Sequence, residues 1–300
     1  MQPAAEPQPA PAPPPTTEPQ HTAAAPPPAQ PSAAAPPPQP TTNPVRIVAF
    51  DFDGTLIDAS SPVRLIFRLT RERIMPVLVG MRIGIWGARY KMGSELDQSL
   101  PRGIIFRSLR RVSAADADAL LRSLYREELR QSLRPQALEE LARHKRDGAE
   151  VLIASASFEP IISEVARDLG ADGFISTQME VADGCYTGKT IGEPPEGEQK
   201  LLQLKQYADE RYGVGNWVLE WAYGDHFSDI PLLEGATHAV AVDPDRRLDR
   251  IARSRGWSIV EWELPGGREV TIGADIIASL LGKAPKRPGG PKTADRRRKR

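Results

Sequence analysis

The stretch "FDFDGTLID", residues 50–58, places two aspartates two positions apart at the end of an apolar run, and the chain turns directly afterwards at Gly54. Residues 47–50 are short, apolar and rich in strand formers, which is typical of a buried parallel strand. Side chains two positions apart in a strand point to the same side, so we expect Asp51 and Asp53 to face one spot at its carboxyl end. Two such carboxylates repel and desolvate each other unless a cation or a reaction uses them.

The sequence beyond this strand predicts an α/β fold with a Rossmann-like parallel sheet and a helical insertion. Residues 60–134 have a mostly helical pattern without a convincing strand, and from Pro135 helices and strands alternate, which is typical of a parallel sheet. The predicted helices are 136–147, 159–169 and 198–212; the predicted strands are 150–154, 218–223 and a final one at 238–242, with a strand-like stretch at 173–181 before a turn at Asp183-Gly184.

The two ends differ in composition from the rest of the chain. Residues 1–44 hold 17 of the 30 prolines and no Lys or Arg, and such a segment buries too little apolar surface to fold. Residues 283–300 carry nine basic residues and one acidic residue. We therefore predict a disordered arm (1–44), a core domain (45–58 and 135–282), an inserted helical lobe (59–134) and a disordered basic tail (283–300).

The formal net charge of zero conceals an asymmetry. Residues 59–112 carry eleven basic and three acidic residues, whereas the core as a whole is acidic. Arg64, Arg68 and Arg71 have the spacing of one helix face. The apolar stretch 74–87 is shorter than the roughly twenty residues of a membrane span. A lobe that is both basic and apolar is typical of proteins that contact anionic lipid. The alternative is an ordinary helical lobe whose arginines are solvated.

The single cysteine and the start of the chain bear on the compartment. Because Cys185 is the only cysteine in the sequence, an internal disulfide and a cysteine metal cluster are excluded. The first residues have neither the basic nor the apolar region of a secretory signal. We therefore expect a cytoplasmic protein, peripheral at the membrane if the lobe binds lipid.

Four stretches with chemically active side chains stand at strand ends or helix starts. Each stretch by itself is weak evidence for a catalytic site, because D-x-D pairs arise by chance and a serine at the end of a strand is usually a helix cap. The stretches are DFDGT (51–55), LIAS (152–155), GEQK (197–200) and GDHFSD (224–229). Together, in this order, they resemble the haloacid dehalogenase superfamily of phosphatases over about residues 46–262, and the insertion resembles a C1-type cap. SASF (155–158) and the residues that follow GDHFSD are most similar to subfamily IB hydrolases related to phosphoserine phosphatase.

The resemblance implies hydrolysis through an aspartyl-phosphate, with Asp51 as nucleophile and Asp53 as general acid and base. Dehalogenases of this superfamily lack the second acid, so Asp53 favours phosphate chemistry. The carboxylates of Asp51 and Asp225 and the backbone carbonyl of Asp53 are oxygen ligands that suit Mg²⁺. Asp229 would orient the waters of the metal ion.

A phosphomonoester dianion repels an anionic nucleophile, so the site must supply positive charge. Mg²⁺ and Lys200 would supply it. Ser155 would donate a hydrogen bond to a phosphoryl oxygen, and Gly54 and Thr55 of the first motif are further candidates for binding the phosphate.

Two departures bear on the substrate. Phosphoserine phosphatases carry a glutamate nine residues after the nucleophile, where this chain has Ser60, and two glycines after the second-motif serine, where it has Ala156 and Ser157. Both argue against phosphoserine and leave a small-molecule or lipid phosphomonoester.

Two alternatives remain open. One is a phosphotransferase or mutase with the same intermediate. The other is a protein that binds a polyanion or a partner through its ends, although a run such as RRRKR binds any polyanion weakly and no specific nucleic acid is expected. The sequence specifies no oligomeric state.

Overall fold

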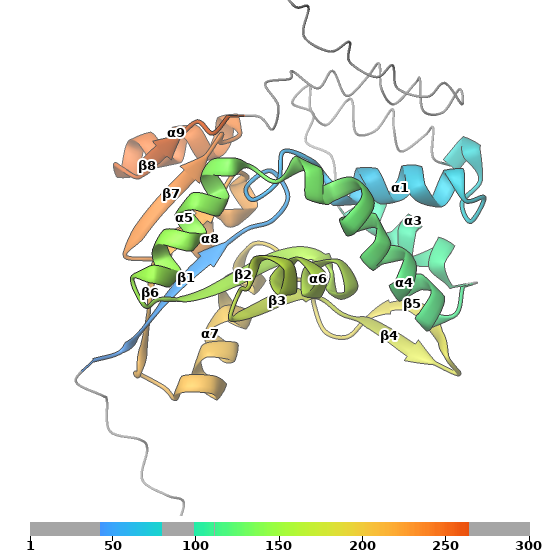
Figure 1. The fold of residues 1–300 in the computed structure, drawn as a ribbon, viewed down its shortest axis with the longest axis horizontal. Helices are drawn as coiled ribbons and strands as arrows, with labels where there is room; N and C mark the ends of the chain where they lie inside the picture. Colours follow the sequence, from blue (N-terminus) through green and yellow to red (C-terminus); the bar gives the residue numbers. More distant parts are fainter. Residues whose placement is uncertain (1–42, 80–98, 111, 264–300) are drawn as a thin grey trace, which may run out of the picture. The chain divides into compact units, whose positions relative to one another are not determined.

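The structure of the chain is a computed structural model that describes residues 43–79, 99–110 and 112–263 (Figure 1). The predicted basic tail, nearly all of the predicted arm and the second half of the apolar stretch at 74–87 lie outside these residues.

Six parallel strands form the central sheet, in the order β3-β2-β1-β6-β7-β8. The first strand, β1, lies between β2 and β6, and its residues 47–50 are fully buried, as expected for a parallel strand covered on both faces. The predicted α/β fold with a Rossmann-like sheet is confirmed. The strands are β1 (Val45–Phe50), β2 (Glu150–Phe158), β3 (Gly173–Thr177), β6 (Trp217–Gly224), β7 (His238–Val242) and β8 (Ser258–Val260).

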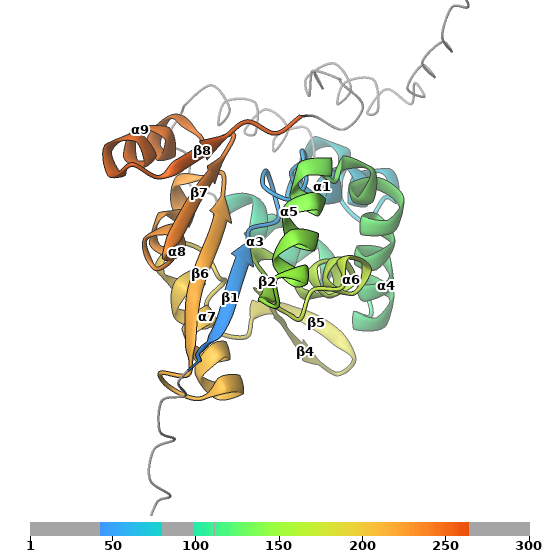
Figure 2. The same ribbon diagram turned by 60° about the vertical axis from the view of Figure 1, so that its left-hand side comes forward.

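Helices cover both faces of the sheet (Figure 2). On one face, α5 (Pro135–Arg146) and α6 (Glu159–Leu169) pack against Val48 and Phe50 of β1. On the other face, Ile47 and Ala49 of the same strand meet a second cluster. That cluster is completed by α7 (Glu198–Tyr212), α8 (Ile230–Glu234) and α9 (Arg246–Arg255).

The helical lobe follows β1 in the chain and shares its hydrophobic core. Leu65, Ile105 and Leu121 from three lobe helices belong to the same buried cluster as Phe50 of β1. No strand occurs in the described part of residues 59–134, as predicted. The lobe contains α1 (Ser61–Arg71), α3 (Ser99–Leu109), α4 (Ala114–Leu124), a π-helical turn η1 (Tyr125–Leu129) and a 3₁₀ turn η2 (Arg130–Ser132).

A β-hairpin of the core reaches the lobe. Strands β4 (Met179–Ala182) and β5 (Cys185–Thr190) pair antiparallel, and both residues of the predicted turn between them have positive φ angles. The backbone N–H of Ala114 donates to the carbonyl of Gly184 at 2.9 Å, and the hydroxyl of Tyr186 donates to Asp118. The hairpin therefore packs against the start of α4.

Three details of the predicted elements are wrong. Strand β2 continues four residues past 154, because after an irregular register Phe158 pairs with Thr177 of β3. The return strand β5 was not predicted. The last strand is not 238–242 but β8, whose three residues are too few to give a periodic signal.

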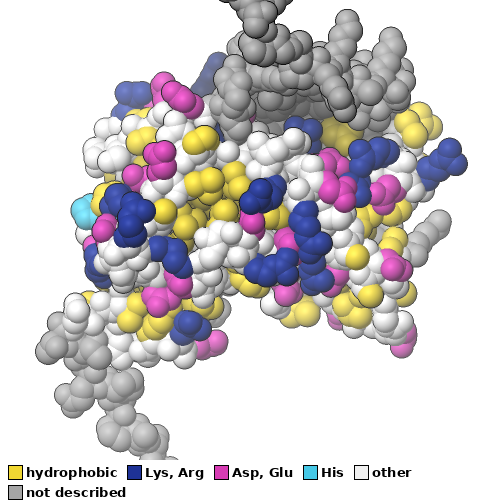
Figure 3. Space-filling view, viewed as in Figure 1, with side chains coloured by type: hydrophobic (Ala, Val, Ile, Leu, Met, Phe, Trp, Pro, Cys, Tyr) yellow, Lys and Arg dark blue, Asp and Glu magenta, His cyan; other side chains and the backbone are white. Residues whose placement is uncertain are grey.

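Two of the three arginines on the predicted basic helix face form ion pairs with acidic residues. Arg68 pairs with Glu72, Glu127 and Glu128, and its side chain is only 11% exposed. Arg71 also pairs with Glu128, at 3.2 Å. On the face drawn in Figure 3, basic and acidic side chains are mixed over the lobe. The described part of the lobe therefore does not support the predicted lipid-binding surface, and no helix among the described residues has the length and apolar character to cross a membrane.

Candidate active site

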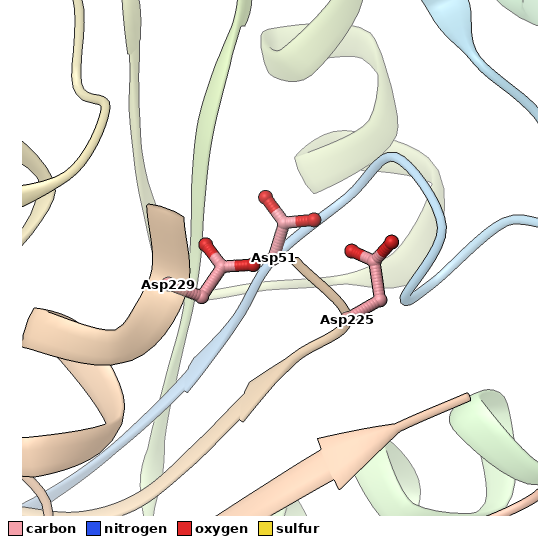
Figure 4. Close-up of side chains that lie close together, drawn as sticks. All are labelled: Asp51, Asp225 and Asp229. Carbon is pink, nitrogen blue, oxygen red and sulfur yellow. The ribbon is translucent and has the colours of Figure 1, made fainter. Parts of the chain in front are cut away.

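Three aspartates converge at the carboxyl edge of the sheet (Figure 4). Asp51 directly follows β1, and Asp225 directly follows the neighbouring strand β6. Asp229 ends the 3₁₀ turn η3 (Phe227–Asp229) that leads into α8. One carboxylate oxygen of each lies within 4.8 Å of the other two. Parallel strands place their carboxyl ends together, so residues far apart in the sequence form one cluster.

Lys200 places a positive charge inside this cluster. It lies in the first turn of α7, which starts after Gly197 with a φ of 58°. Its ammonium donates to Oδ1 of Asp51 at 2.8 Å and to Oδ1 of Asp229 at 2.5 Å. All three side chains are buried. The lysine of the third predicted motif and two predicted acids are thus brought together.

Burial and crowding perturb the acids. Burial raises the pKa of Asp51 to about 7, Asp229 and Asp53 add to the rise, and Lys200 opposes it. Burial, then Asp51 and Asp229, raise the pKa of Asp225 well above its usual value. Although burial alone would lower the pKa of Lys200, the carboxylates of Asp229 and Asp51 raise it. The cluster therefore holds more negative charge than its lysine can balance.

The charge count fits a divalent cation. With all groups ionised, three carboxylates and one ammonium leave two uncompensated negative charges. Buried charge of one sign needs an opposite partner, and a donor set made of oxygen atoms is typical of hard cations. The residues present therefore fit a divalent metal ion.

Gly54 and Thr55 both contact Asp225. The hydroxyl of Thr55 donates to Oδ1 of Asp225 at 3.2 Å. Gly54 has a φ of 84°, and a Cβ there would lie 2.1 Å from Oδ2 of Asp225, so no other residue fits without a shift. These two residues are predicted to bind the phosphate. In the structure, their contacts restrict where the carboxylate of Asp225 can lie.

The carboxylate of Asp53 has other partners and lies outside the three-aspartate cluster. Its Oδ2 accepts from the hydroxyls of Ser157 at 2.6 Å and Ser61 at 2.7 Å, and its Oδ1 accepts from the backbone N–H of Ser61. Burial raises the pKa of Asp53, while the hydrogen bonds from Ser157 and Ser61 oppose the rise. One feature of the sequence pointed to this arrangement, namely Ser157 at a position where phosphoserine phosphatases have glycine.

Ser155 lies on β2, next to the strand that carries Asp51. Phe50 pairs with Ile153 in the parallel register, so Ser155 lies at the same edge of the sheet. Its side chain is buried, and its Oγ accepts from the backbone N–H of Ser157 at 3.1 Å. Every predicted site residue therefore lies at or beside the carboxyl edge of the sheet. The three aspartates with Lys200 form one group there, and Asp53 with its two serines forms the other.

Comparison with known proteins identifies related sequences and a related structure. A family model described as haloacid dehalogenase-like hydrolase matches residues 48–234. A probable phosphatase of Mycobacterium tuberculosis is 36% identical over 167 residues, which cover 54% of this chain and 57% of the relative. A histidinol-phosphatase of Neisseria meningitidis is 35% identical over 122 residues, covering 40% and 55%. The chain thus spans little more than half the length of these curated relatives.

A solved structure supports the fold over a longer range. The crystal structure of a Bordetella pertussis protein of unknown function superposes with a TM-score of 0.65 at 28% identity. The superposition covers 73% of this chain and 99% of that chain.

Proposed function

This chain belongs to the haloacid dehalogenase-like hydrolase family, and from that premise we propose that it hydrolyses phosphomonoesters with the help of Mg²⁺. The observation that carries the proposal is the cluster of buried Asp51, Asp229 and Lys200 with half-buried Asp225, whose surplus negative charge fits one divalent cation. The names of two similar proteins, a probable phosphatase and a histidinol-phosphatase, support the same reaction.

Asp51 is the proposed nucleophile. Lys200 holds its Oδ1 at 2.8 Å, which fixes the carboxylate and leaves Oδ2 for attack on phosphorus. A bond forms between this oxygen and phosphorus as the bond from phosphorus to the ester oxygen breaks. The product of this step is a phosphoryl group on Asp51 and a leaving alcohol.

Asp53 is the proposed acid and base. Its carboxyl gives a proton to the ester oxygen as that oxygen leaves. The resulting carboxylate takes a proton from a water molecule that attacks phosphorus in the second step. The bond between phosphorus and Asp51 then breaks, which releases inorganic phosphate and restores both aspartates.

The carboxylates of Asp51 and Asp225 and the backbone carbonyl of Asp53 would hold the Mg²⁺ ion, with Asp229 orienting its waters. A bound Mg²⁺ neutralises phosphoryl oxygens beside an anionic nucleophile. Gly54 and Thr55 position Asp225 for this role.

Lys200 and Ser155 are the proposed contacts to the phosphoryl group. The ammonium of Lys200 already lies against Asp51, where it can shift toward an incoming phosphate. Ser155 would donate its hydroxyl proton to a phosphoryl oxygen from the neighbouring strand.

The proposed substrate is a small-molecule phosphomonoester. Ser60 stands where phosphoserine phosphatases carry a glutamate, which disfavours phosphoserine. The ion pairs of Arg68 and Arg71 also disfavour a lipid phosphate, because they reduce the positive charge that anionic lipid would meet.

A panel of phosphomonoesters tests the proposal. Phosphate release is measured with histidinol phosphate, phosphoserine, glycerol 3-phosphate, sugar phosphates, nucleotides and a micellar lysolipid phosphate, with Mg²⁺ or with EDTA. We expect release from at least one small substrate that requires Mg²⁺ and disappears in Asp51→Asn. Folded wild-type protein that releases no phosphate from any member would contradict the proposal, and transfer to an added alcohol in place of water would identify a phosphotransferase.

A further inference from the structure

Two serines from different parts of the chain hold the carboxylate of Asp53. Ser61 is the first residue of α1 in the lobe, and Ser157 lies on β2 in the core. Their hydroxyl oxygens lie 2.5 Å apart, and both contact Oδ2 of Asp53. Both serines are almost completely buried. Buried hydroxyls with defined partners have few alternative orientations, so this arrangement restrains the carboxyl group closely.

Asp53 also serves the N-terminus of α1. The first N–H groups of a helix have no partner inside it, and Ser60, at the N-cap position, makes no side-chain capping bond. The backbone N–H of Ser61 instead donates to Oδ1 of Asp53. Both oxygens of the carboxylate are therefore fixed, one by the backbone of the lobe and the other by the hydroxyl pair.

This arrangement separates Asp53 from the aspartate two residues before it. Asp51 is held by Lys200 in the charged cluster, whereas the partners of Asp53 are uncharged. The direction of the Asp53 carboxyl is thus set by the two serines and not by the cluster. A hydroxyl can donate to a carboxylate and can also accept from a carboxylic acid, so the same pair suits both forms of a group that gives and takes a proton.

We propose that Ser61 and Ser157 are positioning residues that aim the Asp53 carboxyl at the leaving oxygen. The inference rests on the proposed function, in which Asp53 gives its proton to that oxygen as the bond to phosphorus breaks. The hydroxyls act through Asp53: they keep this proton donor in the orientation that transfer requires.

The leaving group provides the test. An alkoxide needs a proton in order to leave, whereas p-nitrophenolate leaves as a stable anion. The values of kcat/KM, which report the steps up to departure of the leaving group, are measured for the best-cleaved alkyl phosphate of the panel and for p-nitrophenyl phosphate. We expect Ser157→Ala to lower the alkyl value by about 10-fold or more and the aryl value by less than about 3-fold, given that positioned acid–base groups contribute about 10²–10⁴-fold.

Further variants define the range of the effect. Asp53→Asn gives the full loss from removing the acid, and Ser157→Thr, which keeps a hydroxyl, should recover most of the alkyl activity. Ser61→Ala removes the other hydroxyl from a different element and should show the same selectivity, even if Ser157→Ala folds poorly. The matched control is Thr177→Val, because the buried Thr177 hydroxyl donates to the carbonyl of Ala156 at 2.7 Å without contacting Asp53. It should change both substrates equally.

The outcomes separate this inference from the proposed function. Selective loss on the alkyl ester in Ser157→Ala or Ser61→Ala, with an unselective Thr177→Val, would support the positioning role. Active wild-type protein whose serine variants lose both substrates equally would overturn the positioning role alone. Wild-type protein that cleaves neither substrate would overturn the proposed function and the role of the serines together.

Discussion

Charged residues occur in two contrasting settings in this molecule. Where the lobe meets α6, Arg126 pairs with Glu164 at 2.6 Å and Arg130 with Asp168 at 2.8 Å, and both arginine side chains are more than half exposed. At the carboxyl edge of the sheet, one buried lysine pairs with the buried Asp51 and Asp229, and the half-buried Asp225 lies beside them. In the first setting each acid pairs with an arginine that water reaches. In the second, the acids outnumber the lysine, and the lysine and two of the three acids are buried.

The difference separates structural charges from functional ones. Exposed ion pairs are screened by water and contribute little to stability. Buried charges in unequal number destabilise a fold unless a ligand balances them. The carboxyl edge is therefore where binding and chemistry are expected, and variants at the two places should behave differently.

The largest difference is expected in catalysis. Asp51→Asn should lower kcat by at least about 10⁴-fold, as removal of a nucleophile does in other enzymes, while the asparagine oxygen can still accept from Lys200. The matched variant Asp168→Asn, in the contact between lobe and α6, should stay within about 2-fold of wild type, in line with a surface change. Steady-state phosphate release measures both. Comparable losses in the two variants would show that the contrast has no functional meaning.

The second difference is expected in stability. Lys200→Met leaves the buried acids Asp51 and Asp229 without their cation and should lower the free energy of unfolding, without metal, by about 3–5 kcal/mol. Arg130→Met removes an exposed partner of Asp168 and should shift the urea midpoint far less. Urea unfolding in EDTA compares the two. Equal shifts in midpoint would contradict the account.

A third prediction concerns pH and metal. The pKa of Asp51 is raised from 3.8 to about 7 in the fold, so the stability linked to this group is fully present below pH 3.8 and is lost as pH rises through about 7. A divalent cation favours the ionised form. Mg²⁺ should therefore raise Tm more at about pH 8 than at about pH 5. At 100 times its Kd, a bound ion adds up to about 2.7 kcal/mol to the free energy of unfolding. Thermal scans with Mg²⁺ and with EDTA test this, and an equal effect at both pH values would count against it.

The smallest expected effect is a change in stability that has opposite signs at the two places. Asp225→Asn removes one surplus charge and should raise stability in EDTA by about 1 kcal/mol, the common size of a single stabilising change, while abolishing the Mg²⁺ effect. Glu164→Gln, which removes the acid that Arg126 and Arg167 share, should lower stability. Thermal denaturation of both variants in EDTA gives the signs. Loss of stability in Asp225→Asn would refute the idea of a surplus charge.

The carboxyl edge could be predicted because its information is local. The short apolar run before Asp51 and the one before Asp225 each mark a strand, and the parallel fold brings their ends together. The ion pairs on the basic face of α1 could not be predicted in this way. Arg68 meets Glu127 and Glu128, which lie 59 and 60 residues later in the chain, and helical spacing gives no information about such partners.

The surroundings of Asp53 also lay beyond the sequence pattern. Strand alternation predicts that Asp51 and Asp53 point to the same side, but the chain turns at Gly54, and the carboxylate of Asp53 is directed to Ser61 and Ser157. Those two hydroxyls are 96 residues apart. The sequence identified the acid, and only the fold identified what holds it.

The most direct test of the account is the location of the phosphoryl group during turnover. Wild-type protein is mixed with its best substrate and Mg²⁺, quenched in acid, digested and mapped by mass spectrometry. The account predicts a phosphoryl group on the peptide at Asp51, absent in EDTA and in Asp51→Asn. An active protein that carries the phosphoryl group on another residue would contradict the assignment of Asp51 as the nucleophile.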